Sequence, residues 1–76
     1  MKIKINGIYK HFKGTMMEVL MVATHSETQE EMVIYRHLTD GKIWARPYEM
    51  FAEKVDKIKY PEIDQEYRFE FQKNKN

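Results

Sequence analysis

Residues 16–38 read MMEVLMVATHSETQEEMVIYRHL, a pattern of strand, polar turn and strand. Residues 16–25 are the longest strand-type segment of the chain. Residues 26–30 are polar, and such side chains can hydrogen-bond to the backbone of a turn. Residues 31–38 carry Val33, Ile34 and Tyr35, which predict a returning strand. The stretch therefore predicts a long β-hairpin.

Shorter strands are predicted before and after this hairpin. Residues 7–12 (GIYKHF) are rich in aromatic and β-branched side chains and end at a turn where Gly14 can take a positive φ. Residues 42–46 follow Asp40-Gly41, a dipeptide typical of hairpin turns. Residues 67–71 alternate between aromatic and polar side chains, which predicts a strand with one buried face.

A weaker alternation at the start of the chain also predicts a strand. Ile3 and Ile5 alternate with lysines until Asn6-Gly7 interrupts the pattern, so residues 3–5 are expected to form a short half-buried strand.

Helix is predicted at one place, directly after Pro47. Proline has no N–H for a β-ladder, and Tyr48-Glu49-Met50-Phe51-Ala52 then predicts a short helical turn with Phe51 pointing inward. About five closely spaced strands with one helical turn predict an all-β fold, a small SH3-like barrel. Residues 1–76 are expected to form this single domain, with residues 73–76 as a frayed tail.

The composition predicts a folded, well-solvated protein that needs no cofactor. The 76 residues include no cysteine, so stability has to come from packing and not from disulfides or a cysteine-based zinc site. The longest apolar run, residues 19–23, is far shorter than the ~20 residues of a membrane-spanning helix. We therefore expect a cytoplasmic protein with no membrane segment.

The distribution of charge argues against nucleic acid as the partner. The net charge of +1 includes four lysines near the ends of the chain, namely Lys2, Lys4, Lys73 and Lys75. Residues 7–71 hold nine Lys and Arg against twelve Asp and Glu, a balance of 9 − 12 = −3. Binding to a phosphate backbone requires a basic face, and this mildly acidic body does not predict one.

Several stretches resemble a bacterial family known as domain of unknown function 1653. They are GIYKHFKG at residues 7–14, EVL, VA and HSET between residues 18 and 28, VIYR at residues 33–36, WARP at residues 44–47 and EMF at residues 49–51. Met17 stands where an aromatic residue is usual, and residues 56–66 are longer and more charged than the family's ending. The resemblance implies a small SH3-like barrel in a stand-alone bacterial protein, and it implies no activity.

No arrangement of reactive side chains predicts an enzyme or a metal protein. His11, His25 and His37 lack the local spacing of metal ligands, and the predicted hairpin places His25 and His37 at opposite ends. Ser26 follows His25, but neighbouring strand side chains point to opposite faces, so Ser26 is expected to cap the turn. We predict no catalytic residue and no metal.

The most informative candidate site combines aromatic rings with guanidinium groups. Such groups can stack on a ligand and fork onto its carboxylate or phosphate. The predicted ligand-binding residues are Tyr9, Tyr35, Arg36, Trp44 and Arg46. They predict a non-enzymatic module that binds a protein segment or a small anionic ligand. In the competing interpretation the rings are core residues, and the arginines pair with Glu18 or Glu49.

An alternative function is a small barrel that binds nucleic acid. The residues that would serve it are Tyr9, Lys10, Phe12, Lys13, Arg36 and Arg46. The negative balance of residues 7–71 ranks this alternative second, and an enzyme or a metal protein ranks third.

Overall fold

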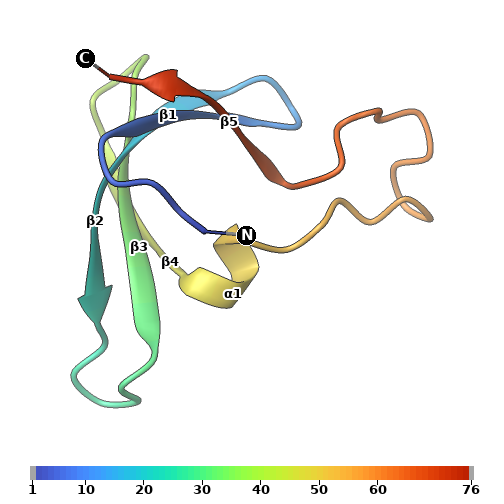
Figure 1. Ribbon diagram of the computed structural model, residues 1–76. Coiled ribbons are helices and arrows are strands. Elements are labelled where there is room, and N and C mark those ends of the chain that lie inside the picture. Colours follow the sequence, from blue (N-terminus) through green and yellow to red (C-terminus); the bar gives the residue numbers. More distant parts are fainter. Residues whose placement is uncertain (1, 76) are drawn as a thin grey trace.

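The predicted hairpin is present as β2 (Met16–Thr24) and β3 (Glu31–His37) in the computed structural model, which describes residues 2–75. The strands pair antiparallel, with a register shift between Val19 and Met21 that lets the long hairpin bend. At the turn the backbone N–H of His25 donates to Glu30 O at 2.8 Å. In Figure 1 this turn projects well beyond the rest of the sheet.

The turn is capped by different side chains from the one predicted. Nδ1 of His25 accepts the backbone N–H groups of Glu27 and Thr28 at 3.1 and 3.3 Å. The Thr28 hydroxyl accepts the N–H of Glu30 at 3.3 Å. The prediction that Ser26 caps the turn is wrong, because among the described residues the imidazole of His25 accepts these N–H groups in its place.

The remaining strands complete one antiparallel sheet. They are β1 (Gly7–His11), β4 (Ile43–Pro47) and β5 (Phe69–Asn74), and the strand order is β4-β3-β2-β1-β5. Every pair of neighbours is antiparallel, and the sheet curls around one core (Figure 1). The prediction of a small, barrel-like all-β fold is confirmed.

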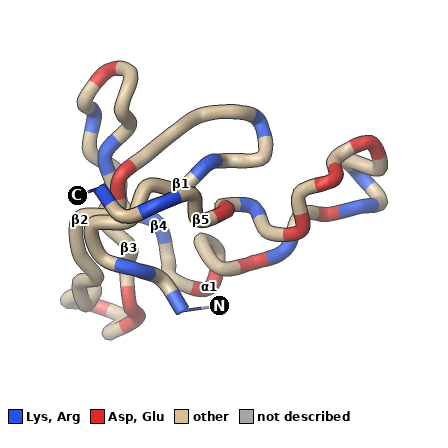
Figure 2. The backbone as a smooth tube through the Cα atoms, turned by 45° about the horizontal axis from the view of Figure 1, so that its top comes forward, with Lys and Arg blue, Asp and Glu red and all other residues tan. Residues whose placement is uncertain are grey.

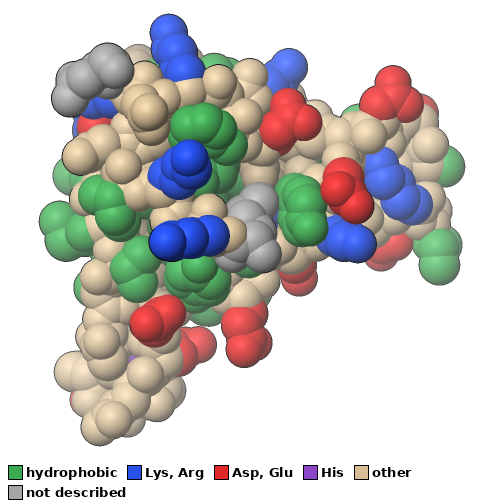
Figure 3. Space-filling view, viewed as in Figure 1, with side chains coloured by type: hydrophobic (Ala, Val, Ile, Leu, Met, Phe, Trp, Pro, Cys, Tyr) green, Lys and Arg blue, Asp and Glu red, His purple; other side chains and the backbone are tan. Residues whose placement is uncertain are grey.

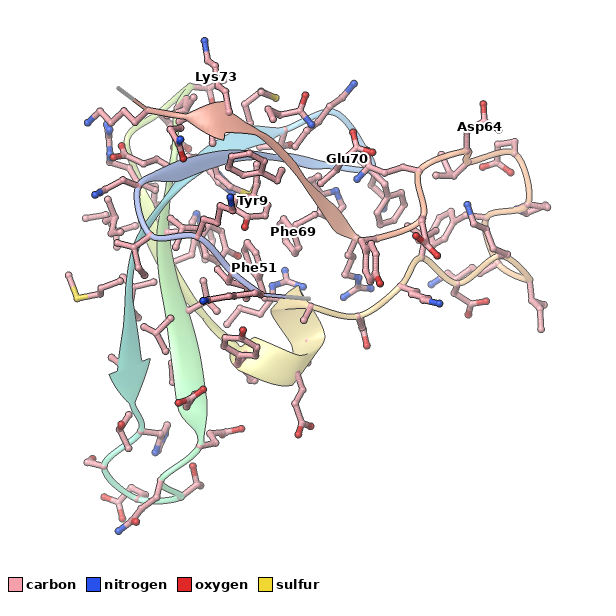
Figure 4. The ribbon with its side chains drawn as sticks, in the orientation of Figure 1. Tyr9, Phe51, Asp64, Phe69, Glu70 and Lys73 are labelled. Carbon is pink, nitrogen blue, oxygen red and sulfur yellow. The ribbon has the colours of Figure 1, made fainter. Side chains whose placement is uncertain are left out.

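Helix α1 (Tyr48–Phe51) lies where the helical turn was predicted and carries Phe51 into the core. Phe51 and Phe69 stack with ring centres 4.1 Å apart and planes 3° from parallel, while Tyr9 meets Phe51 edge-on at 5.5 Å. Figure 4 shows these three side chains converging inside the curled sheet. The buried core cluster comprises Ile3, Tyr9, Met17, Val19, Val33, Tyr35, Phe51 and Phe69.

Residues 3–5 do not form the predicted strand. Asn6 takes a φ of 64°, and Gly7 N–H donates to Lys4 O at 3.1 Å, so the chain reverses in a tight turn before β1. A Cβ on Gly7 would lie 2.9 Å from Lys4 O, which makes glycine the residue that fits this turn. Ile3 is buried, but it reaches the core from the chain just before this turn and not from a sheet strand, and Ile5, expected on the same buried face, is 46% exposed.

The C-terminal end is more ordered than predicted. β5 begins at Phe69, two residues after the predicted start, and continues to Asn74. Lys75 N–H donates to Asn6 O at 2.9 Å, and its ammonium group lies 3.2 Å from Glu18 Oε2. A frayed tail at residues 73–76 is therefore wrong for residues 73–75, because β1 and the turn before it supply partners. Residue 76 lies outside the described residues.

Between α1 and β5 the chain leaves the sheet and returns, and Figure 1 shows this segment projecting to one side. Its two arms are joined by a β-bridge between Lys54 and Tyr67 and by backbone hydrogen bonds from Val55 N–H to Glu66 O at 2.9 Å and from Arg68 N–H to Glu53 O at 3.0 Å. Asp56 Oδ1 accepts the N–H groups of Ile58 and Lys59 at 3.0 and 3.2 Å near its tip. Within residues 2–75 no helix has the length and apolar character of a membrane span.

Candidate functional site

A hollow of about 210 Å³ opens at the end of the sheet where β1 turns into β2. We call it the cationic pocket, and its lining residues are His11, Lys13, Thr15, Met17, Tyr35, His37, Arg46 and Phe69. They come from all five strands and from the turn after β1. The lining includes an arginine, a lysine and two histidines but no carboxylate, so its charge is positive at neutral pH.

Strand pairing explains why side chains so distant in sequence meet here. Tyr35 pairs with Trp44 and Val33 with Arg46 across β3 and β4, and cross-strand partners share a face of the sheet. Val33 and Tyr35 are buried, so this shared face is the core face. His11 pairs with Phe69 across β1 and β5, which closes the pocket from the opposite side.

Arg46 is held in place by aromatic groups. Its Nε donates to the hydroxyl of Tyr35 at 3.4 Å, and its guanidinium carbon lies 5.2 Å from the centre of the Phe69 ring. Among the described residues Arg46 forms no ion pair with a carboxylate. The predicted pairing with Glu49 is therefore absent, and the guanidinium fork keeps donors for a ligand.

His11 lies beside Arg46 in a neutral state. Burial, and after it the positive charges of Arg46, Arg68 and Lys13 together with His37, lowers the pKa of His11 from 6.5 to about 4. Its Nδ1 accepts the Lys13 backbone N–H at 3.1 Å, so the neutral ring carries its proton on Nε2. His11 therefore adds a neutral donor to the pocket at pH 7.

The depressed pKa of His11 makes stability depend on pH. The unfolded chain takes up the extra proton first as pH falls below 6.5, so stability declines between pH 6.5 and about 4. Allowing for solvent screening, we expect the free energy of unfolding to be about 1–2 kcal/mol lower at pH 5 than at pH 7. Urea denaturation at both pH values measures the difference. If His11→Asn shows the same slope, another group causes it.

The structure separates the five predicted ligand-binding residues into two groups. Tyr35 and Arg46 line the cationic pocket, and Trp44 stands at its rim with its ring centre 5.7 Å from that of His37. Trp44 is 41% exposed, so the interpretation that it is a core residue is wrong. Lys42 Nζ lies 4.5 Å from its ring centre.

Tyr9 and Arg36 lie away from the pocket. Tyr9 is 1% exposed and packs in the core, where its hydroxyl accepts the Lys4 N–H at 2.9 Å. Arg36 pairs with Glu18 at 2.5 Å, as the competing interpretation predicted. Since Tyr35 points to the core face, its neighbour Arg36 points to the opposite face and cannot share a ligand with Arg46.

Sequence reasoning missed His11, Lys13, His37 and Phe69 as members of one site. His37 could have been found, because strand alternation places it on the same face as Tyr35 two residues earlier. His11 and Phe69 carry no such signal, since only the pairing of β1 with β5 brings them together. Within residues 2–75 no three His, Asp or Glu side chains gather closely enough to hold a metal ion.

Two other hollows among the described residues differ in charge. One, of about 300 Å³, is lined by Glu30, Glu31, Tyr48 and Glu49 and is acidic. The other, of about 260 Å³, lies at the root of the projecting segment and mixes both signs, with Glu53 and Asp56 beside Lys54, Lys59 and Arg68. The cationic pocket is thus distinguished by its charge and not by its size.

A family model described as "Protein of unknown function (DUF1653)" matches residues 7–71. The chain belongs to the DUF1653 family. The match includes every residue that lines the cationic pocket, so the pocket lies wholly within the DUF1653 region. It also extends past the 56–66 segment to Phe71. No curated protein matches this DUF1653 chain. No solved structure matches it either.

Proposed function

We propose that this DUF1653 protein is a non-enzymatic binding module that holds a small anionic group, a carboxylate or a phosphate, in the cationic pocket. The observation that carries the proposal is the pocket's lining, where Arg46 and Lys13 meet two histidines without a carboxylate. A basic cluster that lacks an internal counter-charge attracts an anion from outside.

The surroundings of Arg46 favour recognition of a planar anion. The Tyr35 hydroxyl and the Phe69 ring restrict the guanidinium group, so less side-chain freedom is lost when a ligand binds. A guanidinium fork matches the two oxygens of a carboxylate or a phosphate. The aromatic walls also limit hydration, which strengthens a charge-assisted hydrogen bond.

The same geometry supports binding over catalysis. The lining holds no carboxylate that could orient an imidazole or accept a proton, and the Nδ1 of His11 is occupied by the Lys13 N–H. A nucleophile activated through His11 would lack the third group that orients such a base.

Nucleic acid remains the second-ranked partner. Figure 2 shows basic and acidic residues alternating along the projecting segment, and Figure 3 shows both signs interspersed over one face of the molecule. A phosphate backbone would meet carboxylates on these surfaces, which weakens binding at physiological salt. The SH3-like character of the barrel, a bacterial origin and a cytoplasmic location stay predictions that accompany this proposal.

Anion binding is tested by titrating the protein with inorganic phosphate and with acetate. We expect dissociation constants on the order of 1–10 mM, equivalent to roughly 3–4 kcal/mol, since a small anion makes few contacts. The readouts are the emission of Trp44 at the pocket rim and the NMR signals of His11. Bound anion should raise the pKa of His11, because it offsets the positive charge of Arg46 and Lys13.

Arginine variants locate the binding site. Arg46→Ala should weaken phosphate binding at least about tenfold, and Arg46→Lys several-fold, because lysine keeps the charge but lacks the fork. Arg36→Lys is the matched control, since Arg36 lies on the other face with Glu18 and should leave binding unchanged. Equal weakening by Arg46→Lys and Arg36→Lys would contradict the proposed site.

A further inference from the structure

β4 is an exposed edge of the sheet beside the cationic pocket. It stands at the end of the strand order and pairs with β3 alone among the strands. Its first three residues, Ile43, Trp44 and Ala45, are all exposed, and Ile43 reaches 59% exposure. Apolar side chains therefore flank the free edge on both faces of the sheet.

The hydrogen bonds of the hairpin show which backbone groups of β4 are free. The N–H of His37 donates to Lys42 O at 2.9 Å, so His37 and Lys42 form a hydrogen-bonded antiparallel pair. Such pairs alternate along the ladder, so Trp44 and Arg46 direct their backbone groups to β3. Ile43 and Ala45 then direct their N–H and C=O groups outward. Pro47, at the next outward position, has no N–H and ends this series of free donors.

This free edge is continuous with the pocket. Trp44 and Arg46 alternate with Ile43 and Ala45, so they point to the core face from the same short strand. A chain laid beside β4 would place alternate side chains next to Trp44 and Arg46. The positive lining of the pocket then favours a carboxylate on that chain.

We infer that the natural ligand is an extended peptide segment of a partner protein, which adds to β4 as a sixth strand and places a carboxylate on Arg46. This inference rests on the proposed anion site and names its ligand class. Backbone hydrogen bonds to Ile43 and Ala45 would supply affinity, while the carboxylate and the Trp44 contact would supply specificity. The carboxylate belongs either to the C-terminus or to an Asp or Glu side chain of the partner.

The test uses an array of random hexapeptides with free C-termini and the same array with C-terminal amides. We expect the bound peptides to share alternating β-branched or aromatic residues and a carboxylate. Loss of binding on amidation indicates a C-terminal carboxylate, and retained binding with a required Asp or Glu indicates a side chain. Selection of proline-rich or basic peptides, or of none, would overturn the inference.

Proline at Ala45 tests the mode of binding. Its N–H points outward, so Ala45→Pro removes a donor for the peptide without removing a bond to β3. We expect it to weaken peptide binding at least about tenfold, while Ala45→Ser, which keeps the N–H, has little effect. Phosphate binding should survive both changes. Peptide affinity that is unaffected by Ala45→Pro would show that β4 is not extended.

Two measurements keep the outcomes distinct. If the wild-type protein binds neither phosphate nor acetate, the proposed anion site is wrong. If it binds these anions but no peptide, only the proposal of strand addition is wrong. If Ala45→Pro fails to fold, methylating single amide nitrogens of a bound peptide replaces it. Strand addition requires that methylation weakens binding at alternate peptide positions. If methylation has no effect on binding at any position, strand addition is excluded.

Discussion

Replacing Phe51 with alanine is expected to lower the free energy of unfolding by about 3–5 kcal/mol, the cost of a large cavity in the core. Phe51 is 0% exposed, stacks on Phe69 and meets the edge of Tyr9. The cavity left by its removal is therefore enclosed by the core, and no surface side chain can fill it. The total stability of a chain this small is on the order of 4–11 kcal/mol. Urea denaturation followed by circular dichroism measures the loss.

Helix α1 provides the control for this change. Met50 precedes Phe51 but is 45% exposed, so Met50→Ala should cost less than about 1 kcal/mol. Where Phe51→Ala is too unstable to measure, Phe51→Leu should still cost about 1–2 kcal/mol because it leaves a smaller void. A loss below about 1 kcal/mol for Phe51→Ala would mean that the aromatic stack is not the centre of the core.

The second large effect is expected at Arg36. Its guanidinium lies 2.5 Å from a carboxylate oxygen of Glu18, whose side chain is only 4% exposed and whose other oxygen is 3.2 Å from Lys75. The hydrogen bond from Arg36 holds the pKa of Glu18 below its usual value. Arg36→Ala leaves a buried carboxylate with one partner and should cost about 2–3 kcal/mol at pH 7.

A double-mutant cycle separates this charge effect from simple loss of packing. In a Glu18→Gln background, Arg36→Ala should cost less than about 1 kcal/mol, because no buried charge is stranded. Arg68→Ala is the matched arginine control, since its partner Glu53 is 46% exposed and surface pairs contribute about 0–1 kcal/mol. Equal costs for Arg36→Ala in both backgrounds would contradict the assigned role of Glu18.

The stabilising effect of Glu18 also has a defined pH range. Because the folded-state pKa of Glu18 is lowered, the ion pair stabilises the protein above the unfolded pKa of 4.5 and is lost as pH falls below it. The His11 contribution is lost earlier, between pH 6.5 and about 4. Both effects have the same sign, so stability should decline in two overlapping steps on acidification.

The candidate site could be predicted only in part, and the reason is geometric. Alternation within β4 places Trp44 and Arg46 on one face, and this information is local. That Arg36 points to the other face follows only from the pairing of β3 with β4, which sets Tyr35 opposite Trp44. The partner of Arg36 is set by the pairing of β2 with β3, and the neighbours of Arg46 are set by the pairing of β1 with β5. Tyr9 illustrates the same point, because an aromatic residue on a strand carries no local sign of whether it faces ligand or core.

Local sequence is enough to predict the long hairpin, the strands around it, the helical turn after Pro47 and the inward position of Phe51. These depend on side-chain period and on turn chemistry, which act over a few residues. Three features depend on the tertiary structure alone: β5 returns to pair with β1, Ile3 enters the core from outside the sheet, and His11 and Phe69 meet Arg46. Those contacts join residues as far apart as Gly7 and Asn74, and their geometry depends on how the whole sheet curls around its core.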